Sequence, residues 1–184
     1  MKFLTRNEAH HEMLSLPTSV RGEAIVTSPP SLRTSPDFVY YLPVEASRLS
    51  AFAHTMSGLI DFENTPILHI AETIVTSDED DLDLLKGYMR GLGEPREIGA
   101  APDRVDFPPC ARFFKNDRVP FVSLIRLVLL FGWDAQVFES KSDRIFLGIS
   151  HDGFIDVWTK NEPARVHIKT YFSNFGLKQA KSAK

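Results

Sequence analysis

The residue types of a hydrolytic triad stand side by side at Ser150-His151-Asp152. A hydroxyl, a base and an acid are the groups that nucleophilic hydrolysis uses, but a triad works through geometry, and adjacent residues rarely point so that one can relay a proton to the next. The chain has no Gly-x-Ser-x-Gly elbow. Asp-Gly between two apolar stretches is a strong hairpin signal, and Ser and His also fit turns. The sequence therefore predicts a hairpin turn at 150–153, with these three residues as catalytic candidates that only geometry can establish.

Cys110 is the only cysteine, and it lies in the stretch Phe-Pro-Pro-Cys-Ala-Arg. The charge of Arg112 would lower the pKa of its thiol, as a reactive thiolate requires. Free cysteines more often behave as small buried hydrophobes, so both interpretations are kept. One cysteine excludes a disulfide within the chain, which favours a reducing compartment and a cytoplasmic location.

The histidines do not show the spacing of a metal site. They stand at His10, His11, His54, His69, His151 and His167. Neither H-E-x-x-H nor C-x-x-C occurs, and Gly91-x-Gly93 follows a predicted helix instead of opening one, which does not fit a phosphate-binding loop. The sequence therefore predicts no metal and no cofactor.

An acidic run begins directly after Ser77 and contains Asp78, Glu79, Asp80 and Asp81. Ser77 is a suitable helix cap, and carboxylates are favourable beside the positive end of a helix dipole. The run lacks the glycine and the terminal glutamate of an EF-hand loop. Residues 61–106 carry twelve acidic and four basic side chains, whereas residues 161–184 carry five basic and one acidic. This segregated charge predicts that the four carboxylates form an acidic surface belt that binds another protein.

Composition gives no support for a membrane or nucleic-acid partner. The longest apolar run, residues 119–131, contains Arg126 and is shorter than the ~20 residues of a membrane span. The N-terminus turns polar too early for a signal peptide. Basic residues gather only near the C-terminus, and the overall pI is about 6.1. The sequence predicts no binding to either.

The same apolar run predicts a central helix over about 119–131. Asn116 or Asp117 is expected to cap it, Pro120 suits its first turn, and Gly132 is expected to end it. Four strands separated by short polar turns are expected to follow as an antiparallel meander. Their ranges are 135–139, 144–150, 154–159 and 164–172.

The rest of the chain adds elements of both kinds. A strand is expected over 37–42, a helix from Pro43 to about residue 60 and a capped helix from Ser77 to Leu92, while 66–76 fits either type. These patterns predict an α+β fold with helices packed on an antiparallel sheet. Residues 1–176 are expected to form one domain with loop-rich segments at 28–36 and 94–110, and residues 177–184 a basic, flexible tail.

Two functions of different classes fit these patterns. The preferred one is a non-enzymatic cytosolic protein-interaction module of the inhibitor, immunity or adaptor type, which uses the acidic belt. The alternative is a small-molecule-binding protein or small hydrolase, with a pocket between helix and sheet and with Ser150, His151, Asp152 or Cys110 at its rim.

Overall fold

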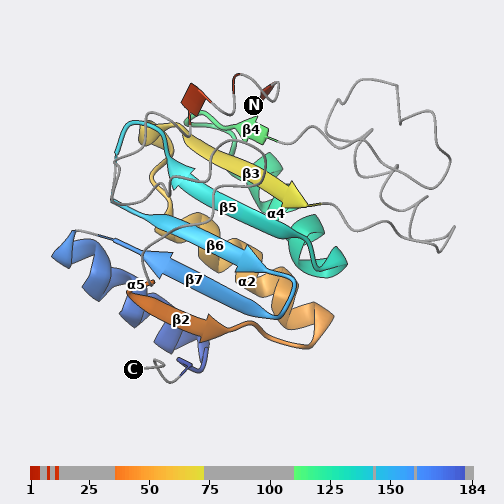
Figure 1. Cartoon of the computed structure of the whole chain (residues 1–184), viewed down its shortest axis with the longest axis vertical. Helices are drawn as coiled ribbons and strands as arrows, with labels where there is room; N and C mark the ends of the chain where they lie inside the picture. Colours follow the sequence, from red (N-terminus) through yellow and green to blue (C-terminus); the bar gives the residue numbers. More distant parts are fainter. Residues whose placement is uncertain are drawn as a thin grey trace, which may run out of the picture.

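The computed structural model describes residues 1–4, 8, 11–12, 36–72, 110–142, 144–159 and 161–180. These residues form three α-helices on one side of a seven-stranded antiparallel sheet (Figure 1), so the expected α+β class is confirmed. The elements in chain order are β1 (Lys2–Leu4), β2 (Phe38–Tyr41), α2 (Ala46–Leu59), the 3-10 helix η1 (Phe62–Asn64), β3 (Pro66–Glu72), β4 (Cys110–Arg112), α4 (Arg118–Phe131), β5 (Asp134–Glu139), β6 (Phe146–Ser150), β7 (Phe154–Trp158) and α5 (Glu162–Phe175).

The strands lie in the order β1-β4-β3-β5-β6-β7-β2, and every neighbouring pair is antiparallel. β5, β6 and β7 are consecutive both in the chain and in the sheet, which makes them a three-strand meander. Residues 178–180 run along the outer edge of β2. There the Tyr41 N–H donates to the Lys178 carbonyl at 2.9 Å, and the Ala180 N–H donates to the Val39 carbonyl at 2.8 Å. This part of the expected tail therefore covers a strand edge that would otherwise expose unpaired backbone groups.

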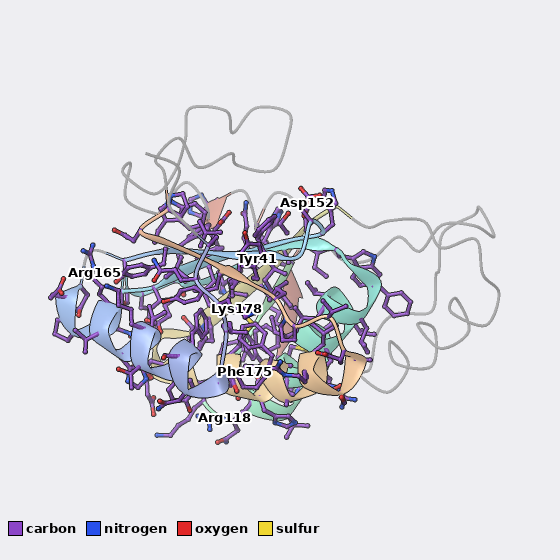
Figure 2. All side chains as sticks on the ribbon, turned by 90° about the horizontal axis from the view of Figure 1, so that it is seen from below. Tyr41, Arg118, Asp152, Arg165, Phe175 and Lys178 are labelled. Carbon is purple, nitrogen blue, oxygen red and sulfur yellow. The ribbon has the colours of Figure 1, made fainter. Side chains whose placement is uncertain are left out.

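All three helices cover the same face of the sheet (Figure 2). Apolar side chains alternate along the strands, so that every second one points toward the helices. On this face the sheet presents Leu68, Ile70, Val137, Leu147, Ile149, Ile155 and Val157, and the helices present Phe52, Met56, Phe121, Leu124, Val128, Ile168 and Phe172. The Phe172 ring lies edge-on to Tyr40 at 5.0 Å between centroids and contacts Phe52 at 5.5 Å. Buried side chains thus fill the layer between the helices and the sheet.

Helix α4 lies where the sequence predicts a helix. Gly132 ends it in the left-handed region, with φ 61°, a conformation that glycine adopts without strain. Asp117 holds the N-cap position, as expected, but its side chain makes no capping hydrogen bond to the helix and instead accepts from the preceding Phe114 N–H at 2.8 Å. No helix within the described ranges is both long and apolar enough to cross a membrane.

Helix α5 replaces the expected fourth strand of the meander, so that prediction was wrong. Its buried residues are Ala164, Ile168 and Phe172, which recur every four positions as one face of a helix does. The Asn161 side chain caps the helix by accepting the Ala164 N–H at 2.9 Å, and Pro163 stands in the first turn. Of the residues 160–163, which the sequence suggests as a strand-to-strand turn, 161–163 are in fact a helix start, and residue 160 lies outside the described residues.

A buried carboxylate joins the end of α2 to the meander. Glu139, at the end of β5, is fully buried, and its Oε1 accepts from the Arg144 guanidinium at 2.5 Å and from the Asp61 N–H at 2.9 Å. Arg144 also donates to the Leu59 carbonyl at 2.9 Å, at the last residue of α2. Asn64 of η1 donates to the second carboxylate oxygen of Glu139 at 3.3 Å. The ionic pair is thereby supplied with the additional hydrogen bonds that a buried charge needs.

Candidate functional site

Ser150, His151 and Asp152 form the turn between β6 and β7, as the hairpin interpretation predicts. Ser150 pairs with Phe154 in register, and the Gly153 N–H donates to the Ser150 carbonyl at 3.0 Å. Gly153 has φ 82°, which explains the need for glycine at this position. The residue types of the candidate triad are therefore those of a tight turn.

His151 has a partner that sequence reasoning did not select. Its Nδ1 lies 3.0 Å from both carboxylate oxygens of Asp134, and its backbone N–H donates to Asp134 Oδ1 at 2.8 Å. Asp134 begins β5, seventeen residues earlier. The signal for it lies in strand pairing: Ala135 is opposite Ile149, which places Asp134 beside the β6–β7 turn.

This corner does not have the geometry of a Ser-His-Asp triad. His151 Nε2 lies 3.4 Å from Asp152 Oδ1, and the Ser150 hydroxyl oxygen accepts the Asp152 N–H at 3.2 Å. In a triad the second imidazole nitrogen faces the nucleophile, whereas here it faces a carboxylate. The two carboxylates hold the half-exposed imidazole in one orientation. The His151 side chain is therefore an oriented polar group on the surface.

Cys110 lies elsewhere, in β4, and only 1% of its surface is exposed. It packs with Leu4, Ile67, Phe138 and Phe146 in a second apolar cluster. Burial raises the pKa of its thiol to about 12, and the charge of Arg112 lowers the pKa by less. The interpretation as a small buried hydrophobe therefore describes Cys110, and the expected activation by Arg112 is outweighed.

The side of the sheet away from the helices carries a distinctive surface over β2, β6 and β7. We call it the open-face patch and define it as Val39, Tyr41, Gly148, Phe154, Asp156 and Trp158. Register brings these residues together, because Tyr41 is opposite Phe154, and Asp156 stands between Val39 and Gly148. Alternate residues of a strand share a face, so Phe154, Asp156 and Trp158 all point to this side.

The patch continues into the turn and the strand end beside it. The rings of Tyr41 and Phe154 are 5.2 Å apart, and Tyr41 is 49% exposed. Val44, three residues after Tyr41, is 91% exposed. The Leu42 N–H donates to the Gly153 carbonyl at 2.8 Å, which ties this segment to the His151 turn. Figure 2 shows the Asp152 turn on the side of the sheet away from the helices.

No family model, curated protein or solved structure matches this chain. The geometry of the described residues therefore carries the functional argument alone.

The remaining candidates from the sequence are the other histidines and the acidic belt. Within the described residues, no three His, Cys, Asp or Glu side chains lie together as a metal site would require. His54 is exposed on α2, His69 belongs to β3, and His167 on α5 lies beside the tilted ring of Tyr171 at 5.2 Å between centroids, so these three are separated by the fold. The acidic belt of Asp78, Glu79, Asp80 and Asp81, with the helix expected after Ser77, lies outside the described residues.

Proposed function

We propose that this chain is a non-enzymatic protein-interaction module and that its partner binds the open-face patch together with Val44. The observation that carries the proposal is the exposure of Val44 and Tyr41 beside the ring of Phe154. Aromatic side chains at the surface are enriched in the centres of protein interfaces, where they contribute much of the binding energy. The adjoining His151 corner supplies a polar rim whose imidazole is already oriented by Asp134.

Carboxylates in and beside the patch indicate the charge that the partner carries. Asp134 and Asp152 flank the His151 turn, and Asp156 lies within the patch. The sequence places four further carboxylates at 78–81. Complementary charge increases association rates and selects among partners, so the partner we propose presents basic groups around an apolar centre. A cytoplasmic location is part of the proposal, because the single cysteine is a buried thiol.

Affinity purification with matched variants tests the proposal. Tyr41→Ser combined with Val44→Asp removes the exposed apolar groups, and we expect capture of the partner to fall by about thirtyfold or more, the effect of losing an interface hot spot. Val166→Asp is the control, because Val166 is 56% exposed on α5, on the helix side of the molecule. Equal capture by the wild type and the double variant would overturn the proposal.

The contribution of the acidic belt needs its own variant. Charge reversal by Asp78→Lys, Glu79→Lys, Asp80→Lys and Asp81→Lys is expected to abolish capture of a basic partner while the circular dichroism spectrum stays unchanged. Undiminished capture by this folded variant would remove the belt from the binding surface and leave the open-face patch as the site.

A further inference from the structure

Asp156 is placed unusually for an acidic residue. It lies in the middle of β7, with β6 on one side and β2 on the other, so it is away from the strand ends where charged groups reach water easily. Its cross-strand neighbours on the open face are Gly148 and Val39. Neither can donate a side-chain hydrogen bond to its carboxylate.

Two aromatic residues flank Asp156 along its strand. Phe154 and Trp158 precede and follow it on the same face of β7. A Cβ atom added to Gly148 would lie 3.3 Å from Cζ3 of Trp158 and 3.6 Å from Cβ of Asp156. The tip of the indole and the stem of the aspartate therefore both lie over Gly148, where any larger residue would be crowded by the indole. The Phe146 ring supports the indole edge-on, with 5.6 Å between centroids.

Burial is what raises the pKa of the Asp156 carboxyl above its ordinary value. No hydrogen bond or ion pair joins its carboxylate to another residue in the described part of the chain. A half-buried carboxylate without such compensation disfavours its own charged form and costs folding free energy. A bound cation would remove that cost, and the described residues do not supply one.

We propose that Asp156 receives one basic side chain, a lysine or an arginine, of the protein partner. A carboxylate binds either cation through charge-assisted hydrogen bonds, and aromatic rings at its sides attract cations through their π faces. This inference rests on the proposed function, because it names the chemistry that the partner brings to the patch. A single carboxylate among rings suits an organic cation better than a metal ion, which requires several oxygen or nitrogen ligands.

Nuclear magnetic resonance titration with small model peptides tests this subsite without the partner. The probes are acetyl-Gly-Arg-Gly-amide, acetyl-Gly-Lys-Gly-amide and, as the neutral match for arginine, acetyl-Gly-citrulline-Gly-amide. We expect the charged peptides to shift the amide signals of Gly148, Asp156 and Trp158 with saturation at roughly millimolar concentration, since one ion pair binds weakly. The citrulline peptide is expected to give no saturable shift at these positions.

Two variants make the assignment specific. Asp156→Asn is expected to weaken binding of both charged peptides by about tenfold or more, because it removes the charge and keeps the shape. Glu162→Gln, at an exposed carboxylate in the first turn of α5 and outside the open-face patch, is the control and should bind as the wild type does. Absence of saturable shifts, equal shifts with citrulline, or undiminished binding by Asp156→Asn would each overturn the subsite.

The two proposals fail separately. The titration measures binding of a cationic peptide at Asp156 in the isolated chain. The capture experiment with Tyr41→Ser and Val44→Asp measures binding of the protein partner to the open-face patch and Val44. A negative titration with capture still dependent on Tyr41 and Val44 overturns the Asp156 subsite alone. A positive titration with capture independent of Tyr41 and Val44 overturns the interaction surface that the proposed function names.

Discussion

At the scale of single residues, packing changes what the same residue types can do. Cys110 and Arg112 are two positions apart in β4, so they share a face of the strand, and the guanidinium charge acts to lower the pKa of the thiol. The neighbouring apolar cluster nevertheless removes water from the thiol, and this desolvation outweighs the guanidinium. Asp156 shows the same effect on a carboxyl, because burial raises its pKa without a cation to oppose it.

The thiol of Cys110 should be unreactive in the folded protein. At pH 8 a thiol with a pKa of about 12 carries almost no thiolate, and its buried position excludes the reagent. We expect iodoacetamide to label Cys110 only after denaturation, as measured by intact mass. Val119→Cys is the matched control, since that position on α4 is exposed and should label rapidly in the native state. Rapid native labelling of Cys110 in the wild type would contradict its burial.

Asp156→Asn should raise the melting temperature near pH 7. The folded-state pKa of this carboxyl is raised above its ordinary value of 3.8, so the folded protein binds the proton more tightly than the unfolded chain. Stability from this group is therefore lost as the pH rises from below 3.8 through the folded-state pKa. Thermal melts across pH 3 to 7 should show a gap between variant and wild type that opens as the pH rises. A gap that is constant with pH would exclude this carboxyl as the cause.

At the scale of elements, α5 depends on local signals that compete with an alternating pattern. The alternation of Val166 and Ile168 favours one face of a strand, but the buried residues of this segment, Ala164, Ile168 and Phe172, are four positions apart. The Asn161 cap, Pro163 in the first turn and Gly176 at φ 84° define both helix ends. Helix capping and tertiary packing of one face outweigh the strand propensity of the β-branched residues.

Asn161→Ala should destabilise the protein by about 1 kcal/mol, because it removes the hydrogen bond to the Ala164 N–H that caps α5. Urea unfolding measures the loss as a lower midpoint at unchanged slope. Asn174→Ala, at an exposed position in the last turn of the same helix, is the control and should change the midpoint little. Equal effects of the two substitutions would show that the cap does not contribute.

At the scale of the whole molecule, Glu139 connects parts of the chain that lie far apart in the sequence. Its carboxylate accepts from Asp61, Asn64 and Arg144, which brings the end of α2, the 3-10 helix and the β5–β6 connection to one point. The neighbouring hydroxyls of Thr65 and Ser140 are 2.5 Å apart and extend this junction. The helix layer and the sheet are thus joined by polar groups as well as by the apolar core.

Glu139→Ala should lower the free energy of unfolding by about 3–5 kcal/mol, since it leaves Arg144 and two further donors without their acceptor. Glu139→Gln keeps one acceptor oxygen and should cost less. Lys115→Ala breaks an exposed ion pair with Glu63, and we expect no measurable change from that control. Chemical denaturation of the three variants gives the comparison, and a Glu139→Ala protein as stable as the wild type would contradict the role of this junction.

The sequence by itself determined the α+β class, a helix over about 119–131 with its glycine stop, and the Asp-Gly hairpin. These features depend on capping, hydrophobic periodicity and turn chemistry, all of which act over a few neighbouring residues. The tertiary structure alone decided that Asp134 reaches His151, that Cys110 is desolvated and that Val39 and Gly148 lie opposite Asp156. Strand register and burial set these relations between residues distant in the chain, and local patterns contain neither.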